Sequence, residues 1–527
     1  MGSDDVETIP GALARAVREV PGTEAVVDGD TRLTYAQLGA EVRRVSRALE
    51  ARGVRRGDRI ARWAPNSAEW VATAVGALSA GAVLVPVNTR YKGDEARWIL
   101  EGSAARLLFV ENGFLGNDYL GMLGAGPGGA LPGLPDLAGV VAFDGDAVPG
   151  TTGWADFLGA GDSPPDDGAA PTREGAAVVS SGDPADVLFT SGTTGRPKGV
   201  VCTHGQNVRT FGAWCDRTGL DRGDRYLVIN PFFHCFGYKA GILACLLRGA
   251  TMVLQPVFRA DETLRLAEAE RITVLPGPPT VYAAMLDAPG RNRYDLSTLR
   301  LAVTGAASVP VALVERVRAE LGMQVITAYG LTEACGTVTV CTLEDDSRTV
   351  ATTAGRPIEG VEVRVADDRG GEAGPGTVGE VLVRGHNVMR GYLGDEEATA
   401  KAVVDGWLRT GDLGRLDDRG NLTITGRLKD MFVVGGFNVY PVEVEQVLTG
   451  HPGVSEAAVV GIPDERLGEV GRAYVTARPG AEPTEAGLVA HCRERLANFK
   501  VPREVVVLGD LPRNAAGKVR KADLLAH

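Results

Sequence analysis

The sequence of 527 residues lacks several features that would place it in a particular class of protein. It has no cluster of Lys and Arg, and its formal net charge of −12 argues against non-specific binding to nucleic acid. It has no run of about 18 apolar residues, so we expect no transmembrane helix. The acidic start, MGSDDVETIP, lacks the apolar segment of a secretory signal. We therefore expect neither insertion into a membrane nor a nucleic-acid partner.

Cysteine is scarce and its pattern excludes the common cysteine-based sites. The seven cysteines are scattered, their number is odd, and no C-x-x-C pair occurs. This usage favours a reduced, cytoplasmic setting over a disulfide framework or a zinc site. The contents of hydrophobic residues (44%) and charged residues (23%) are ordinary for a globular enzyme.

The stretch TSGTTGRPKG, Thr190–Gly199, combines four hydroxyl side chains and three glycines with one lysine, Lys198. A Walker A loop would need a glycine where Pro197 stands and Ser or Thr where Gly199 stands, so the stretch is not a P-loop. The apolar DVLF before it and the β-branched VVCT after it predict a loop between two strands. A plain surface turn is the alternative, but the hydroxyls and the lysine favour a phosphate-binding loop.

Helix-like and strand-like patterns alternate from about residue 33 to 340, which predicts α/β layers with largely parallel sheets. Gly-, Pro- and Asp-rich stretches at about 124–175 predict flexible surface loops. Short β patterns after about residue 355 predict a small β subdomain. A further α+β pattern of roughly 100 residues predicts a separate domain. We therefore predict a large N-terminal domain and a small C-terminal domain.

Four motifs occur in a fixed order: TSGTTGRPKG, YGLTE, GWLRTGDLGRLDDRGNLTITGRLKD and PRNAAGKVRK. With them the chain resembles, over nearly its whole length, the adenylate-forming superfamily of acyl-CoA synthetases, luciferases and peptide-synthetase adenylation domains. The resemblance implies an ATP-dependent, AMP-forming acid:CoA ligase that uses Mg²⁺. Acid and ATP would give acyl-AMP and pyrophosphate, and CoA would then give the thioester.

The resemblance also assigns roles around the ATP phosphates. Glu333 would be the Mg²⁺ ligand and Thr332 would contact the α-phosphate, both as catalytic residues. A single carboxylate suffices because Mg²⁺ takes one or two carboxylates together with phosphate oxygens and water. The phosphate-binding residues would be Thr190, Ser191, Gly192, Thr193, Thr194, Gly195 and Lys198.

Around the nucleoside, the resemblance implies that Asp412 accepts hydrogen bonds from both ribose hydroxyls and that Arg427 adds a donor. Small residues would let the backbone approach the adenine base closely. The adenosine-binding set would be completed by Gly305, Ala306, Ala307, Tyr329 and Gly330.

The C-terminal motifs imply a catalyst and a moving part. Lys518 would neutralise charge between the substrate carboxylate and the α-phosphate during adenylation. Lys429 would be the hinge about which the small domain turns before the second step, which divides the chain into an N-terminal domain, 1–428, and a small mobile C-terminal domain, 429–527. Gly435, Gly436 and Phe437 would then admit the pantetheine arm of CoA.

The segment PFFHCFGYKAG would form the acyl pocket, with His234 as a catalytic gate beside Phe236. Tyr238 and Lys239 begin a predicted helix, KAGILACLL, and would also line the pocket; Lys239 would contact a polar group of the acid. The alternatives are a packed core histidine at position 234 and a solvent-facing lysine at position 239.

FHCFGYKAG and KDMFVVGGFNVYPVEVEQVL look most similar to an actinobacterial branch of the superfamily. That branch activates the indane-dione propanoate left after removal of steroid rings A and B. Three alternatives stay open: an aryl-acid or medium-chain ligase, an enzyme that loads a carrier protein, and nitrite activation for diazotisation. No fused carrier domain is visible. The predicted partners are the acid, ATP and CoA, and a homodimer is left open.

Overall fold

A computed structural model describes residues 6–125, 131–143, 150–161, 179–190, 197–305, 309–367, 370–434, 437–464, 466–496, 498–514 and 518–525. The chain forms two compact units. The first contains Met1–Glu362 and Val383–Leu408, and the second contains Val363–Leu382 and Arg409–His527. The predicted boundary at Lys429 lies inside the second unit, and the role of this residue as a hinge stays a prediction.

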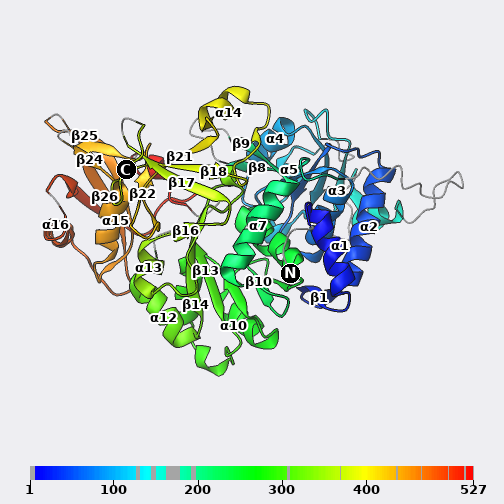
Figure 1. Cartoon of the computed structure of the whole chain (residues 1–527), viewed down its shortest axis with the longest axis horizontal. Coiled ribbons are helices and arrows are strands. Elements are labelled where there is room, and N and C mark those ends of the chain that lie inside the picture. Colours follow the sequence, from blue (N-terminus) through cyan, green and yellow to red (C-terminus); the bar gives the residue numbers. More distant parts are fainter. Residues whose placement is uncertain are drawn as a thin grey trace, which may run out of the picture. The chain divides into compact units, whose positions relative to one another are not determined.

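Two large sheets form the framework of the first unit (Figure 1). The nine-stranded sheet has the order β16-β15-β14-β13-β12-β10-β11-β1-β2, and the eight-stranded sheet has the order β19-β9-β8-β4-β3-β5-β6-β7. The central strands of both sheets pair in parallel, whereas β2, β15, β16, β9 and β19 pair antiparallel. The predicted α/β class with largely parallel sheets is confirmed.

The strands of the nine-stranded sheet are β1 (Glu24–Asp28), β2 (Thr31–Thr34), β10 (Arg225–Val228), β11 (Thr251–Leu254), β12 (Val274–Pro276), β13 (Leu301–Gly305), β14 (Gln324–Tyr329), β15 (Thr339–Val340) and β16 (Arg356–Pro357). Those of the eight-stranded sheet are β3 (Arg59–Trp63), β4 (Val83–Pro86), β5 (Ala105–Val110), β6 (Gly139–Ala142), β7 (Thr152–Gly153), β8 (Pro184–Thr190), β9 (Lys198–Thr203) and β19 (Gly391–Tyr392).

Helices join these strands, and several begin where the sequence supplies a cap. Thr34 and Gln37 form a capping box at the start of α2, and Thr203 and Gln206 form another at the start of α7. The helices are α1 (Ile9–Glu19), α2 (Tyr35–Ala51), α3 (Ala68–Ser79), α4 (Gly93–Gly102), α5 (Tyr119–Met122), α6 (Trp154–Gly159), α7 (His204–Thr218), α8 (Cys235–Gly237), the π-helix η3 (Tyr238–Leu243), α9 (Ala244–Arg248), α10 (Ala260–Ala269), α11 (Pro279–Leu286), α12 (Val311–Leu321), α13 (Ser347–Thr352) and α14 (Glu396–Ala402).

The prediction of surface loops at about 124–175 is wrong for part of that range. Strands β6 and β7 and helix α6 lie inside it, and the side chains of Val141 and Phe157 are fully buried. The Phe157 ring meets that of Phe109 edge-on at 5.1 Å. The apolar segments GVVAF and WADFL are short, so the Gly- and Pro-rich sequence around them obscured their pattern.

The α+β pattern lies in the second unit, and the small β subdomain is divided between the units. The subdomain consists of β17 (Val361–Ala366), β18 (Gly379–Gly385), β20 (Val403–Val404), β21 (Trp407–Leu416) and β22 (Leu422–Arg427), and its residues 361–362, 383–385, 403–404 and 407–408 are assigned to the first unit. A further sheet has the order β24-β23-β26-β25, with β27 beside β26. Its elements are β23 (Phe432–Val434), β24 (Phe437–Val439), α15 (Pro441–Thr449), β25 (Val454–Asp464), β26 (Gly468–Ala477), α16 (Glu485–Arg493), β27 (Glu504–Leu508) and α17 (Lys521–Leu524).

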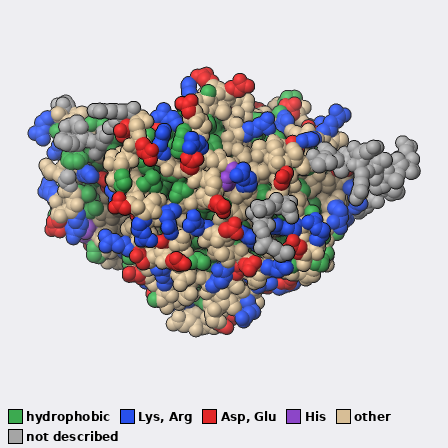
Figure 2. Space-filling view, in the orientation of Figure 1, with side chains coloured by type: hydrophobic (Ala, Val, Ile, Leu, Met, Phe, Trp, Pro, Cys, Tyr) green, Lys and Arg blue, Asp and Glu red, His purple; other side chains and the backbone are tan. Residues whose placement is uncertain are grey.

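Charges of both signs are mixed on the visible surface, and the cysteines are buried. On the face in Figure 2, positive and negative side chains are interspersed and do not form one basic patch. No helix among the described residues is long and apolar enough to cross a membrane. All seven cysteines lie in the described residues, and each is a buried free thiol.

His204, the first residue of α7, provides a pH-dependent test of the packing of the first unit. Its Nδ1 accepts a hydrogen bond from the Ile9 amide at 3.4 Å, and burial lowers the pKa of His204 to about 4. The unfolded chain binds this proton near pH 6.5, so the folded state loses stability as the pH falls from 6.5 towards 4. We expect this one group to cost about 3 kcal/mol over that window.

Urea unfolding of the wild type and of His204→Gln, between pH 7.5 and pH 4.5, measures this cost. All six tryptophans lie in the first unit, so their fluorescence follows that unit. The variant should lose less stability than the wild type as the pH falls. Parallel pH profiles of the two proteins would contradict the assignment.

Candidate functional site

The predicted phosphate loop connects two antiparallel strands. Strands β8 and β9 pair from Pro184↔Thr203 to Thr190↔Lys198. The prediction of a loop between two strands is confirmed, and no helix follows the lysine as it would in a P-loop. The predicted phosphate-binding residues Ser191, Gly192, Thr193, Thr194 and Gly195 lie outside the described residues. The hairpin holds Thr190 and Lys198 opposite each other at its end.

Glu333 faces the end of this hairpin. It lies in the short 3₁₀ helix η5 (Thr332–Ala334), just after β14, and its side chain is half-buried. Its Oε1 accepts hydrogen bonds from the Tyr392 hydroxyl at 3.1 Å and from Thr190 Oγ1 at 3.4 Å. Burial, together with the charge of Glu333, raises the pKa of Tyr392, so the phenol stays protonated and donates.

The ammonium group of Lys198 lies over the ring of Tyr392. It is 5.0 Å from the centroid of the Tyr392 ring and 3.9 Å from Asp395 Oδ2. A pocket of about 360 Å³ opens beside it, lined by Lys198, Tyr392, Asp395, Glu397, Ala398, Lys401 and Ala402. The predicted phosphate-binding lysine is therefore exposed to a space into which a ligand can enter.

The chemistry around Glu333 suits a hard cation. Both hydrogen bonds to Glu333 come from hydroxyl groups and both use Oε1, and within the described residues Oε2 accepts no hydrogen bond. The described residues contain no group of three or more His, Cys, Asp and Glu side chains that could hold a metal alone. One carboxylate fits Mg²⁺, which fills its other positions with phosphate oxygens and water.

The predicted adenosine wall is only partly described. Gly305 ends β13 and pairs with Ala328 of the neighbouring strand β14. A Cβ on Gly305 would meet the Ala328 carbonyl oxygen at 2.5 Å, so packing between strands alone requires glycine there. Tyr329 ends β14 and is half-buried, and Gly330 follows it. The predicted residues Ala306 and Ala307 lie outside the described residues.

Thr332 lies in the same turn as Glu333. Its hydroxyl is 4.0 Å from the Sγ of Cys235, and its carbonyl oxygen is 4.0 Å from the Sγ of Cys202. The structure therefore places Thr190, Lys198, Thr332 and Glu333 around one end of the β8–β9 hairpin. Their roles towards ATP stay predictions.

Asp412 and Arg427 face each other in the second unit. They are opposite residues of the antiparallel pair β21–β22, and Arg427 Nε lies 3.1 Å from Asp412 Oδ1. The Asp412 side chain is buried, whereas that of Arg427 is exposed. The predicted ribose acceptor and the predicted second donor thus form one ion pair.

The predicted C-terminal residues are all in the second unit. Lys518 is exposed and is joined to Asn514 by two hydrogen bonds, from the Asn514 amide to the Lys518 carbonyl and from the Lys518 amide to Asn514 Oδ1. Lys429 is exposed in the turn between β22 and β23. Phe437 begins β24, and the predicted CoA-binding glycines Gly435 and Gly436 lie outside the described residues.

His234 is exposed and caps the short helix α8. Its Nδ1 accepts a hydrogen bond from the Phe236 amide at 3.1 Å. The alternative of a packed core histidine is therefore wrong. The side chain of Phe236 is half-buried, and the role of both residues at an acyl pocket stays a prediction.

Tyr238 and Lys239 begin the π-helix η3 and are fully buried. The Lys239 ammonium lies 3.0 Å from Asp186 Oδ1 of β8, which is also fully buried. Burial alone would lower the pKa of Lys239, but the charge of Asp186 raises it well above the usual value. A solvent-facing lysine is excluded. The ammonium has a protein partner, so its burial does not require a substrate carbonyl.

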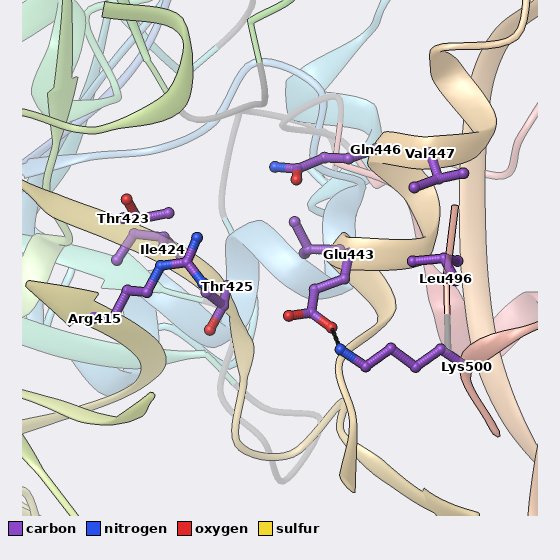
Figure 3. Close-up of a pocket in the computed structure, with 10 residues that line it drawn as sticks. Arg415, Thr423, Ile424, Thr425, Glu443, Gln446, Val447, Leu496 and Lys500 are labelled. Carbon is purple, nitrogen blue, oxygen red and sulfur yellow. Dashed lines mark hydrogen bonds and ion pairs between the residues drawn. The ribbon is translucent and has the colours of Figure 1, made fainter. Parts of the chain in front are cut away.

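A second pocket, of about 340 Å³, lies in the second unit (Figure 3). Glu443 of α15 and Lys500 form an ion pair at its edge, and the buried Thr425 hydroxyl has no hydrogen-bond partner among the described residues. No site residue predicted from the sequence lines this pocket. The lining consists of Arg415, Thr423, Ile424, Thr425, Val442, Glu443, Gln446, Val447, Leu496 and Lys500.

The comparisons with known proteins agree with this fold. Residues 13–393 match the AMP-binding enzyme family, and residues 443–518 match the AMP-binding enzyme C-terminal domain. The chain is 52% identical to the 3-[(3aS,4S,7aS)-7a-methyl-1,5-dioxo-octahydro-1H-inden-4-yl]propanoyl:CoA ligase of Rhodococcus jostii, covering 98% of this chain and 97% of that protein. It is 51% identical to the ligase of the same name from Mycobacterium tuberculosis, covering 99% of each.

Solved structures show the same architecture. The anthranilate CoA ligase AuaEII in complex with anthranoyl-AMP superimposes with a TM-score of 0.88 at 30% identity, over 100% of this chain and 98% of that one. ATP-bound MatB from Rhodopseudomonas palustris superimposes with a TM-score of 0.85 at 30% identity, over 98% of each chain.

The α/β fold and the two family matches define an adenylate-forming enzyme. The chain belongs to the AMP-binding enzyme family. It is an AMP-forming acid–thiol ligase that uses ATP and CoA and acts through an acyl-adenylate.

Proposed function

We propose that the acid activated by this ligase is a propanoate attached to an indane-dione ring system. The observation that supports this is the identity of 52% and 51%, over nearly the full length, to two ligases whose names specify that acid. A soluble keto acid of this kind presents one carboxylate to be activated and two ketones that accept hydrogen bonds.

For the first step, we infer that Lys198 and the hydroxyls of the loop after Thr190 bind the β- and γ-phosphates, with Glu333 as the Mg²⁺ ligand. When bound, Mg²⁺ offsets negative charge on the phosphate oxygens. Thr332 contacts the α-phosphate, and Asp412 with Arg427 binds the ribose. Lys518 offsets the charge that builds up as the substrate carboxylate attacks the α-phosphorus and pyrophosphate leaves.

For the second step, the domain that carries Lys518 turns about Lys429, and the strand that begins at Phe437 borders the path of the pantetheine arm. The CoA thiolate attacks the acyl carbon, and AMP leaves. Such a hinge needs only a few backbone positions that absorb the change in φ and ψ. His234 and Phe236 gate the acyl pocket.

An acid panel tests the proposed substrate. Purified protein with ATP, Mg²⁺ and CoA is given the indane-dione propanoate, octanoate, ferulate or nitrite, and the loss of CoA thiol and the formation of AMP are followed. The keto acid should have a kcat/KM at least about 100-fold above those of the other acids. A higher kcat/KM for octanoate or ferulate would overturn the proposal, as would AMP formation with nitrite but not with the keto acid.

A further inference from the structure

Among the described residues, Glu333 and Lys198 form no bond with each other, and Tyr392 contacts both. It ends the two-residue strand β19, which pairs with β9 through Tyr392↔Val200 and Gly391↔Val201. Its hydroxyl donates to Glu333 Oε1 at 3.1 Å, and its ring lies 5.0 Å from the Lys198 ammonium. The tip of one side chain thus contacts the carboxylate while its face contacts the cation.

Backbone hydrogen bonds anchor the segment around Tyr392 both to Glu333 and to the strand that begins at Lys198. The Met389 amide donates to the Glu333 carbonyl at 2.8 Å, and the Leu393 amide donates to the Gly199 carbonyl at 2.7 Å. The Tyr392 amide is itself bound to Thr399 Oγ1 at 2.9 Å. The position of the ring is therefore tied to both the turn that carries Glu333 and the strand that begins at Lys198.

The arrangement also keeps two opposite charges apart. Among the described residues, Lys198 pairs with Asp395 and not with Glu333. A direct ion pair between Lys198 and Glu333 would offset both charges and leave neither group to its ligand. Lys198 has a contact of 3.9 Å with the partly exposed Asp395, and Oε2 of Glu333 accepts no hydrogen bond within the described residues, so the two charges do not offset each other.

We propose that Tyr392 is a positioning residue for adenylation: it fixes the Glu333 carboxylate for Mg²⁺ and separates it from the Lys198 ammonium. This inference rests on the roles proposed above for Glu333 and Lys198. A hydrogen bond to a ligating carboxylate fixes its orientation, and loss of such a partner typically costs about 10- to 100-fold in metal affinity or activity.

Tyr392→Phe keeps the ring and removes only the hydroxyl, so it tests the contact with Glu333. We expect the half-saturating Mg²⁺ concentration of acid-dependent ATP–pyrophosphate exchange to rise about tenfold or more. The KM for ATP and the rate at saturating Mg²⁺ should change little. Tyr392→Leu removes the ring as well and should also raise the KM for ATP, because the Lys198 ammonium loses its contact with the ring face.

A binding measurement provides a readout that does not depend on turnover. Mn²⁺ is titrated into the enzyme with the unreactive analogue α,β-methylene-ATP and followed by electron paramagnetic resonance. Tyr392→Phe should weaken Mn²⁺ binding about tenfold or more. The matched control is Tyr119→Phe, which removes a phenol hydroxyl bonded to the Thr89 carbonyl at 2.7 Å elsewhere in the first unit. It should leave Mn²⁺ binding unchanged.

Glu333→Gln distinguishes the positioning role of Tyr392 from the proposed role of Glu333 as metal ligand. If Glu333→Gln weakens Mn²⁺ binding and Tyr392→Phe does not, the positioning role is wrong and the proposed metal ligand stands. If Glu333→Gln leaves Mn²⁺ binding unchanged, the proposed ligand is wrong and Tyr392 has nothing to position. Weaker binding in both variants, with the Tyr119→Phe control unchanged, supports the inference.

Discussion

Replacing Lys518 by alanine is expected to lower the rate of acyl-adenylate formation by at least about 100-fold, because a preorganised cation at the developing charge is lost. The same variant should convert supplied acyl-adenylate and CoA into thioester at nearly the wild-type rate. In the proposed cycle Lys518 serves only the first step, since the domain turns before the second. The two half-reactions should therefore separate in this one variant.

The structure explains why the change should be local. Lys518 is exposed, and its two hydrogen bonds with Asn514 use the backbone of Lys518 together with the amide and the Oδ1 of Asn514. Removing the side chain leaves those bonds in place. Lys521→Ala is the matched control, because Lys521 lies nearby and pairs with Glu445 at 2.7 Å. It should adenylate within a few-fold of the wild type.

Each half-reaction is measured alone: ATP–pyrophosphate exchange without CoA for the first step, and loss of CoA thiol with synthetic acyl-adenylate for the second. If Lys518→Ala slows both steps equally, the separate role of Lys518 is wrong. If Lys521→Ala is slowed as strongly as Lys518→Ala, the effect belongs to the whole loop and not to one ammonium group.

Lys239→Met is expected to destabilise the first unit by about 3–5 kcal/mol. The side chains of Lys239 and Asp186 are each 0% exposed and lie 3.0 Å apart. Methionine resembles lysine in length but carries no charge, so the Asp186 carboxylate would be left buried without its counter-charge. An unpaired buried charge costs far more than the net contribution of an intact pair.

Urea unfolding followed by tryptophan fluorescence measures this loss. The matched control is Lys401→Met, whose ion pair with Glu397 is 74% and 80% exposed and is therefore screened by solvent. It should leave the free energy of unfolding almost unchanged. Adding Asp186→Asn to Lys239→Met removes the stranded charge and should recover part of the stability. Equal stability of Lys239→Met and the wild type would contradict the buried pair.

The ion pair between Lys239 and Asp186 also affects the interpretation of any change in substrate preference in a Lys239 variant. A lysine without a protein partner would need a substrate group, whereas Lys239 already has Asp186. Lys239→Met could selectively lose activity with the keto acid. This would support the predicted contact only if the double variant with Asp186→Asn, which recovers stability, loses that activity as well.

The features that the sequence predicted well have local causes. The hairpin around the phosphate loop follows from two short apolar segments and the glycines between them. The helices α15 and α16 and the strands β25, β26 and β27 follow from alternation and three-four spacing within single segments. The four motifs indicated the family because each is contiguous in the chain.

The features that were missed depend on residues far apart in the chain. Asp186 and Lys239 meet only because β8 and the π-helix η3 pack together. The sequence predicted a substrate contact for Lys239, and nothing in either segment indicated Asp186 as its partner. Tyr392 reaches Glu333 across 59 positions of the chain through a strand of two residues, too short to produce a periodic pattern. The only local signal for this contact was the tyrosine in MRGYLGDEEATA, which is followed by the acidic first turn of a helix.

The measurement that tests the central claim most directly is acid-dependent exchange of radiolabelled pyrophosphate into ATP without CoA, followed by addition of CoA. With the indane-dione propanoate, exchange should require both the acid and Mg²⁺. One CoA thiol should then be consumed for each AMP released. Thioester formation without prior exchange, or release of ADP and phosphate in place of AMP and pyrophosphate, would contradict an acyl-adenylate route.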